Sequence, residues 1–159
     1  MTVLSLCREL DRGSAYWPPF IPKDMRFPEI DRILKEKVET VPFPNDIVMI
    51  FDGCDIGKVT LRPYDERSEK LLRGYRDQVS SLVEVRYPGH DDFRFHIGID
   101  YGIAQLSEND WEECSIFCMQ MTEKLRKTEK PFSIPKPHYV IFNDMLSYET
   151  DLSKRGPLH

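Results

Sequence analysis

The sequence predicts an α+β fold in which a largely antiparallel sheet is flanked by helices. Two β-rich segments, Ile47 to Phe51 and Lys58 to Arg62, flank a turn region that contains Gly53 and Gly57, which is typical of a β-hairpin. Several longer segments repeat apolar residues at helical spacing. Hairpins mixed with helices indicate α+β rather than a doubly wound parallel sheet, and the chain contains no Gly-rich phosphate loop of the dinucleotide or P-loop type.

Composition limits the class of protein further. The 159 residues suit one domain, and a hydrophobic share of 40% is enough to form a core. No apolar run approaches the ~20 residues of a membrane span, and the first residues lack the features of a signal peptide. We therefore expect a soluble, cytoplasmic protein. The net charge of -5 disfavours DNA and extended nucleic-acid binding, but a local basic patch could hold one phosphate.

The first half of the chain predicts a strand, a loop and a helix ahead of the hairpin. Thr2 to Leu6 is β-branched and apolar, as in a strand. Asp11 to Pro28 is proline-rich and has no sustained period, which predicts a long ordered loop pinned by aromatic residues. Pro28 suits the first position of a helix, and the apolar pattern that follows continues to Pro42.

The second half predicts two further helices and two short strands. The first helix begins at Asp65 and ends near Tyr87, before a Pro-Gly pair. Ser107 caps the next helix, which extends to about Thr128. Strands are expected around Phe132 to Ile134 and Tyr139 to Phe142. A domain of residues 1–150 is then followed by a flexible tail, residues 151–159.

The segment from Phe93 to Tyr101 is the most informative for function. Aromatic and aliphatic residues alternate with polar or small ones, so a strand here would place Arg94, His96 and Gly98 on one face. Imidazole titrates near neutral pH, which makes His96 the leading candidate for proton transfer, and Gly98 would leave room for a ligand. The alternative is that this face is simply the solvated side of a half-exposed sheet.

The remaining histidines and the cysteines are weaker candidates. His90 lies in a predicted turn, and His138 lies at a strand entrance with nothing to place it near His96. The four cysteines occur without a secretory signal, so we expect reduced thiols and no disulfides. Cys114 and Cys118 are one helical turn apart without a second ligand pair, which favours a buried helix face over a zinc site.

The segment FHIGIDYGI resembles the second signature of the two-histidine (2H, LigT-like) phosphoesterase superfamily. Further segments resemble one branch of it, a domain-of-unknown-function family: the opening MTVL, the WP of SAYWPPF, RPYDERSEKLLRGYRDQV, PGHDDFRFHIGIDYGIAQLS and PHYVIFNDM. The resemblance implies a two-lobed fold, in which two H-x-[ST] motifs face each other across a cleft. It also implies chemistry without a metal or a cofactor.

The expected site contains five residues, of which the resemblance gives roles to His96 and Thr2. His96 would be the catalytic acid or base, Thr2 a phosphate donor and Arg94 a phosphate clamp, while Gly98 and Tyr101 would also line the substrate site. Met1 and Thr2 look like the second and third positions of the first motif, whose histidine would precede residue 1. We therefore expect an incomplete first lobe and an N-terminal truncation. In the second motif, Gly98 replaces the hydroxyl residue.

These features predict a phosphoesterase-like domain for a cyclic phosphodiester or a related ester, with activity impaired by the missing histidine. The expected partner is a small phosphorylated molecule or an RNA end with a cyclic phosphate. One alternative is a non-catalytic pseudoenzyme that binds a phosphorylated ligand. Another is an interaction domain that uses the loop around Trp17 and Phe20.

Overall fold

The computed structural model describes the chain except for residues 100–104, 129, 145–146 and 156–159. The chain forms two compact units, which are described separately. Unit 1 comprises Met1–Val3, Asn45–Leu72 and Asp92–Pro135, and unit 2 comprises Leu4–Pro44, Arg73–Asp91 and Lys136–His159. Helices and antiparallel strands occur together, which confirms the α+β class. No helix among the described residues is long and apolar enough to cross a membrane.

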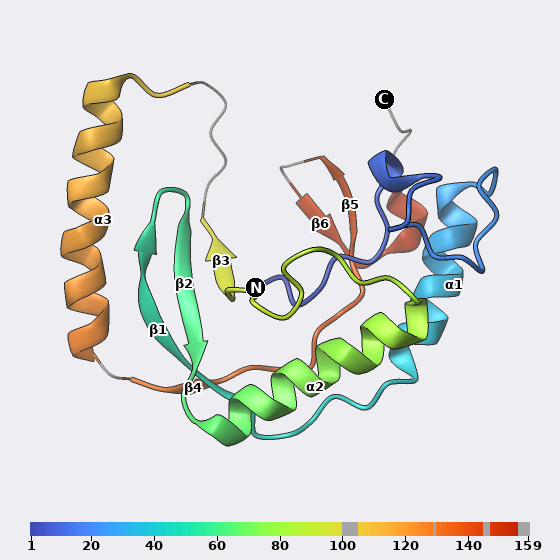
Figure 1. The fold of residues 1–159 in the computed structure, drawn as a ribbon, viewed down its shortest axis with the longest axis horizontal. Coiled ribbons are helices and arrows are strands. Elements are labelled where there is room, and N and C mark those ends of the chain that lie inside the picture. The colour runs from blue at the N-terminus through green and yellow to red at the C-terminus, as the bar shows by residue number, and fades with distance from the viewer. Residues whose placement is uncertain (100–104, 129, 145–146, 156–159) are drawn as a thin grey trace. The chain divides into compact units, whose positions relative to one another are not determined.

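Unit 1 is built on a four-stranded antiparallel sheet with the order β3-β2-β1-β4 (Figure 1). Its strands are β1 (Val48–Asp55), β2 (Lys58–Pro63), β3 (His96–Gly98) and β4 (Phe132–Ser133). β1 and β2 form the predicted hairpin, and Gly57 in its turn has a φ of 75°, a left-handed conformation that glycine adopts without strain. The pairing shifts between Phe51 and Gly53, which leaves Asp52 as a β-bulge.

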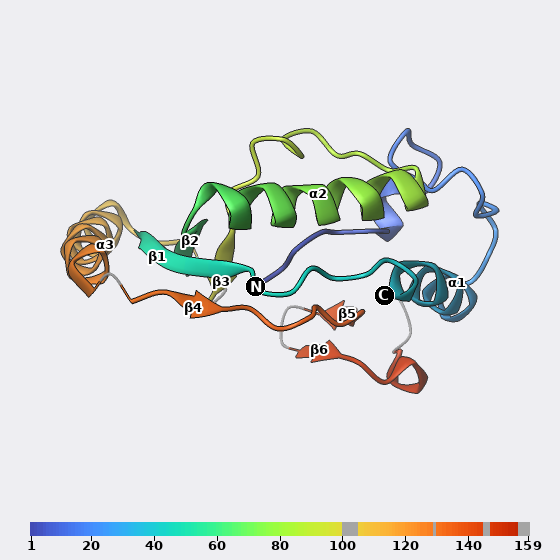
Figure 2. The same ribbon diagram turned by 90° about the horizontal axis from the view of Figure 1, so that it is seen from below.

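Helix α3 (Glu108–Thr128) belongs to unit 1 and lies along β1 (Figures 1 and 2). The Thr122 hydroxyl accepts a hydrogen bond from the Cys54 backbone N–H at 2.9 Å, and Arg126 Nε donates to the Asp52 carbonyl at 2.8 Å. These side chains satisfy backbone groups that an uncovered strand edge would leave open. Gly53 allows this close approach, because an added Cβ would lie 3.1 Å from Thr122 Oγ1.

Helix α2 (Glu66–Val83) contributes residues to both units. The helix begins at Glu66, one residue after the predicted start at Asp65, and Asp65 Oδ1 caps it by accepting a hydrogen bond from the Ser68 backbone N–H at 2.7 Å. The helix ends at Val83, four residues before the predicted end at Tyr87. Glu84 has a φ of 56°, and this left-handed residue stops the helix earlier than the Pro-Gly pair would.

Unit 2 has its own hydrophobic core, formed mainly by α1 (Phe27–Glu39) and the loop that precedes it. The proline at the start of α1 is Pro28, as predicted. The core cluster contains Trp17, Ile21, Phe27, Ile30, Leu34, Val83 and Val85. The predicted aromatic anchoring of the loop is thus confirmed for Trp17, which is buried, while Tyr16 and Phe20 pack against the cluster.

Short elements complete unit 2. They are the 3-10 helices η1 (Glu9–Asp11) and η2 (Leu152–Lys154) and a two-stranded antiparallel sheet of β5 (Ile141–Asp144) and β6 (Ser147–Glu149). The sequence analysis did not predict β6. Arg155, in the segment expected to be a flexible tail, forms an ion pair with Asp31 at 2.6 Å. The domain limits themselves stay a prediction.

Two predicted strands differ from the structure. The segment from Thr2 to Leu6 forms no strand, because no neighbouring strand pairs with it among the described residues. Of the strand predicted from Phe93 to Tyr101, His96–Gly98 form β3, paired with Thr60, Val59 and Lys58 of β2, and the Leu61 N–H also donates to the Phe95 carbonyl at 2.8 Å. The end of the prediction, residues 100–101, lies outside the described residues. Phe95 is buried at 1% exposure as expected, whereas Ile99 is 61% exposed rather than part of a core.

Candidate functional site

A row of polar and small residues lies on one face of the paired strands β2 and β3 in unit 1. The register places His96 opposite Thr60 and Gly98 opposite Lys58. Residues directly opposite each other in an antiparallel pair share a face, and so do residues two apart on one strand. Lys58, Thr60, His96 and Gly98 therefore form one surface, here called the polar row.

The His96 ring is held by its own strand. Its Nδ1 lies 3.0 Å from the carbonyl oxygen of Arg94, and the ring packs beside Phe93 with the ring centroids 5.9 Å apart. A carbonyl oxygen can only accept, so Nδ1 carries the proton and donates it. In the neutral imidazole, Nε2 then keeps the lone pair. This half-buried histidine therefore offers a proton acceptor at Nε2.

Thr60 supplies a hydroxyl next to this imidazole, and the sequence analysis did not single it out. It is half-buried, and its neighbour across β1 is Gly53. The Thr122 side chain of α3 lies beside Gly53, 3.1 Å from where a Cβ would be. Alternation along β2 could have placed Lys58 and Thr60 on one face. Only the pairing register shows that this face is the one that carries His96.

Three cationic side chains lie in or near the polar row, and each is paired with an aspartate. Lys58 Nζ lies 3.0 Å from Asp55 Oδ2, and Arg62 Nε lies 3.6 Å from Asp52 Oδ1. Arg126, from α3, approaches the same Asp52 oxygen at 3.7 Å. All three pairs are exposed to solvent, where such contacts are weak, so an incoming phosphate could compete for these cations.

The residues that the sequence predicted for this site are brought together only in part. His96 and Gly98 share the polar row, while the Arg94 side chain is exposed and its carbonyl group orients His96. Thr2 is exposed and belongs to unit 1, and the amino terminus lies beside β3 in both views of Figures 1 and 2. No described contact joins Thr2 to His96. Tyr101 lies outside the described residues.

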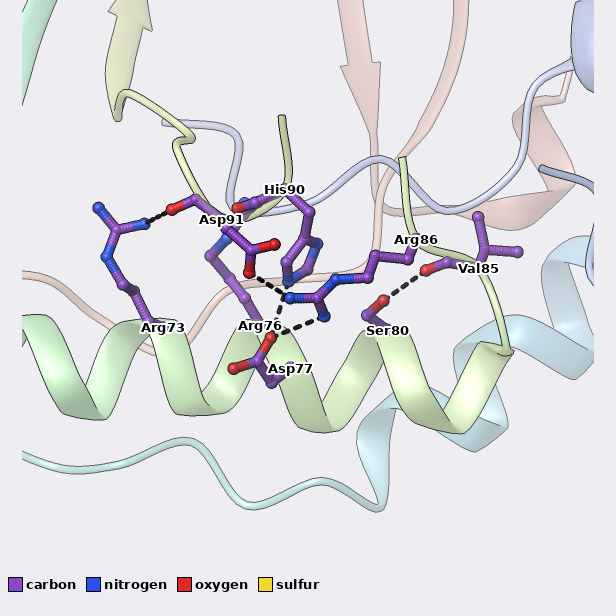
Figure 3. A network of polar contacts seen from close by, with 8 residues as sticks. All are labelled: Arg73, Arg76, Asp77, Ser80, Val85, Arg86, His90 and Asp91. Carbon is purple, nitrogen blue, oxygen red and sulfur yellow. Dashed lines mark hydrogen bonds and ion pairs between the residues drawn. The ribbon is translucent and has the colours of Figure 1, made fainter. Parts of the chain in front are cut away.

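A second polar cluster, in unit 2, surrounds the turn that follows α2 (Figure 3). His90 is only 6% exposed, and its Nε2 lies 3.0 Å from Asp77 Oδ1. Arg86 bridges Asp77 and Asp91, and Arg76 Nη2 donates to the His90 carbonyl oxygen at 3.1 Å. The charged groups of the cluster bond to one another across the turn. The cluster therefore holds the turn against α2 and has a structural role, whereas the residues of the polar row are half-buried or exposed.

Burial decides the protonation state of His90. Desolvation, and then the nearby positive charge of Arg76, lower the pKa of His90, while its hydrogen bond to Asp77 opposes the shift. Nε2 donates to the Asp77 carboxylate, which leaves Nδ1 as a buried acceptor with no hydrogen-bond partner among the described residues. The sequence analysis expected only an ordinary polar turn residue here, because a turn signal carries no information about burial.

No group of three His, Cys, Asp or Glu residues with a geometry suited to a metal ion occurs in the described part of the chain. The histidines other than His96 belong to unit 2, so the polar row has one imidazole from its own unit. The polar row can accept a proton at His96 Nε2, and it carries the Thr60 hydroxyl and the Lys58 ammonium on the same face.

Comparisons with known proteins support the fold and the resemblance. Residues 1–59 match the family described as 2H-phosphodiest, domain of unknown function (DUF1868), which confirms the predicted resemblance over this segment. The fold is similar to that of a conserved protein of unknown function from Agrobacterium tumefaciens str. C58. That structure has a TM-score of 0.75 and 20% sequence identity over 87% of this chain. The chain spans 60% of its length. No curated protein matches.

Proposed function

We propose that the polar row binds a phosphate ester and that His96 transfers a proton in the metal-independent hydrolysis of a cyclic phosphodiester or a related ester. The observation that carries this proposal is the hydrogen bond from His96 Nδ1 to the Arg94 carbonyl, which leaves Nε2 free to accept a proton. The match of residues 1–59 to a 2H phosphodiesterase family supports the reaction class.

The proposed step transfers one proton and exchanges one phosphorus–oxygen bond. His96 Nε2 accepts a proton from a water molecule as the water oxygen bonds to phosphorus. The bond to the leaving oxygen breaks, and that oxygen takes a proton from solvent or from the imidazolium. A cyclic phosphodiester thus opens to a phosphomonoester and a hydroxyl group within one molecule.

Neighbouring residues would stabilise the charge on the phosphate oxygens. The Thr60 hydroxyl and the Lys58 ammonium lie on the His96 face, and Lys58 can exchange its exposed pair with Asp55 for a phosphate. Arg94 and Thr2 are exposed residues of the same unit and are proposed as further phosphate contacts. Gly98 would admit the ligand close to the backbone, and Tyr101 is kept as a proposed substrate contact.

The proposed activity is weak. A two-histidine mechanism uses one imidazole as a base and another as an acid, whereas unit 1 provides His96 alone. Losing one such group typically costs ~10²–10⁴-fold in rate. Gly98 also contributes no hydroxyl to the row. A second candidate function is the binding of a phosphorylated ligand without turnover. It is favoured by Gly98, which stands where the second motif has a hydroxyl residue.

Turnover of a 2′,3′-cyclic nucleotide and of an RNA end with a cyclic phosphate separates these functions. We expect slow hydrolysis by the wild-type chain and a further ~10²-fold loss in His96→Gln. The matched control is His138→Gln, which removes an exposed histidine of unit 2 and should retain the wild-type rate. Equal rates for wild type and His96→Gln would refute the catalytic role. Saturable binding without turnover in any variant would establish the binding function instead.

A further inference from the structure

Two cysteines of unit 1, distant in sequence, meet where α3 packs against β1. The sulfur atoms of Cys54 and Cys118 are 3.7 Å apart, although the residues are separated by 64 positions in the chain. Both side chains are half-buried, so a small reagent can reach them. The polar row and the mechanism proposed above use neither residue.

The backbone around these thiols is held by a separate set of hydrogen bonds. Thr122 Oγ1 accepts from the Cys54 N–H at 2.9 Å and lies 2.8 Å from the Cys118 carbonyl, to which it donates. One threonine thus connects the two cysteine-bearing backbones. This connection holds the two cysteine-bearing backbones close to each other, and the side chains then bring the sulfurs to 3.7 Å.

We propose that Cys54 and Cys118 are a redox-sensitive pair that forms a disulfide between β1 and α3 when it meets a low-molecular-weight disulfide. The sequence predicts reduced thiols, because the four cysteines occur without a secretory signal. No short spacing joins Cys54 and Cys118, so the sequence does not predict their contact. Their proximity is created by the packing of α3 on β1.

The reaction is a thiol–disulfide exchange with glutathione disulfide as the oxidant. One cysteine thiolate attacks a glutathione sulfur and releases one glutathione thiolate. The second cysteine thiolate then attacks the protein sulfur of this mixed disulfide and releases the other glutathione. The two protons of the cysteine thiols pass to the released thiolates. The two cysteines are oxidised and one glutathione disulfide is reduced to two glutathiones.

The protonation of Cys118 sets the expected rate. Burial, followed by the hydrogen bond and charge of Cys54, raises the pKa of Cys118 to about 11. Only the thiolate reacts, so oxidation should be slow at pH 7 and faster at pH 9. The disulfide would hold α3 on the edge of β1, and closing a loop of this length should raise the thermal unfolding temperature by several degrees.

The experiment incubates the reduced full-length chain with glutathione disulfide and follows the products by mass spectrometry after alkylation and trypsin digestion. Trypsin places Cys54 in the peptide 38–58 and both Cys114 and Cys118 in the peptide 95–124. We expect these two peptides to be joined within one chain. Because the second peptide holds two cysteines, the Cys114→Ser and Cys118→Ser variants identify the partner.

The controls separate the proposed pair from general thiol oxidation. Cys118→Ser should reduce formation of the cross-link ~10-fold or more, since it removes a partner already held in place. Cys114→Ser and Cys7→Ser should retain it, and Cys7 lies in unit 2. A cross-link that persists in Cys118→Ser, mixed disulfides with glutathione alone, or a cross-link only between chains would each overturn the proposal.

Discussion

The two units differ in the burial and hydrogen bonding of their polar side chains. In unit 2, Asp31 is 2% exposed and receives bonds from Arg155 at 2.6 and 2.7 Å and from the Tyr139 hydroxyl at 2.9 Å. In unit 1, the polar row leaves His96 Nε2 without a described hydrogen-bond partner and pairs its lysine only at the surface. Buried polar groups must be paired, whereas exposed groups are available to a ligand.

This difference separates structural polar residues from candidate functional ones. The His90 cluster is as rich in charge as the polar row, yet its charged groups are bonded within the cluster. His90 Nδ1, which has no hydrogen-bond partner among the described residues, is buried, whereas His96 is partly exposed. The sequence presents both histidines in similar polar surroundings, six residues apart. Their environments, and not their residue types, indicate that His96 is the one available for chemistry.

The largest expected effect comes from breaking the buried pair in unit 2. Asp31→Ala leaves the Arg155 guanidinium, which is 10% exposed, without its carboxylate, and we expect the free energy of unfolding to fall by ~3–5 kcal/mol. Urea denaturation measures this change. The matched control is Arg32→Ala, which removes an exposed pair with Glu36 and should cost less than ~0.5 kcal/mol. Similar losses in both variants would contradict the account of unit 2.

The next largest effect is the loss of stability when a buried apolar side chain is truncated, compared with an exposed one in the other unit. Leu34 is fully buried in the core of unit 2, so Leu34→Ala should cost ~2–5 kcal/mol. Phe117 on α3 is 59% exposed, and Phe117→Ala should change stability by ~0.5 kcal/mol or less. Denaturation midpoints of both variants, with hydrogen exchange of the α3 amides, check the contrast. A large cost at Phe117 would mean that α3 is covered in solution.

A smaller effect appears as a dependence on pH. The pKa of His90 is lowered in the folded chain, mainly by burial and by Arg76, so below its ordinary value of 6.5 the unfolded chain binds more protons. Stability should therefore fall as the pH decreases from 6.5 towards the folded pKa and should be unaffected well above 6.5. Urea denaturation between pH 7.5 and 5 measures the slope, and His90→Gln should remove this part of it.

Asp77 contributes in a separate, more acidic range. Burial raises the pKa of this carboxyl, but hydrogen bonds from Arg86 and His90 outweigh that effect and hold it below its usual value of 3.8. Its contribution is lost only as the pH falls below about 4. If His90→Gln leaves the slope of stability against pH unchanged between pH 6.5 and 5, a group other than His90 causes that slope.

The sequence predicts the fold where local signals agree with the final packing. The hairpin, α1 with Pro28, and α3 with its Ser107 cap all follow from periodicity, turn residues and capping residues. The prediction of a strand over Thr2 to Leu6 was wrong, because β-propensity alone cannot supply a strand to pair with. β3 ends at Gly98, where its partner strand β2 begins at Lys58, and an alternating pattern does not show where the partner strand begins.

The candidate site could be predicted only as far as one strand. Alternation alone places Arg94, His96 and Gly98 on one face. Thr60 depends on the register between β2 and β3, and the contact between Cys54 and Cys118 depends on the packing of α3. The burial of His90 likewise results from tertiary packing. Such contacts join distant parts of the chain and leave no local trace in the sequence.

The most direct test of the central claim is ligand binding at the polar row. Nuclear magnetic resonance of the full chain, labelled with ¹⁵N and titrated with a 2′,3′-cyclic nucleotide, reports each imidazole and each backbone amide. We expect saturable shifts at the His96 ring and at the amides of Lys58 and Thr60, with the His90 ring unchanged. Saturable shifts centred on His90, or none at His96, would contradict the assignment of the site to the polar row.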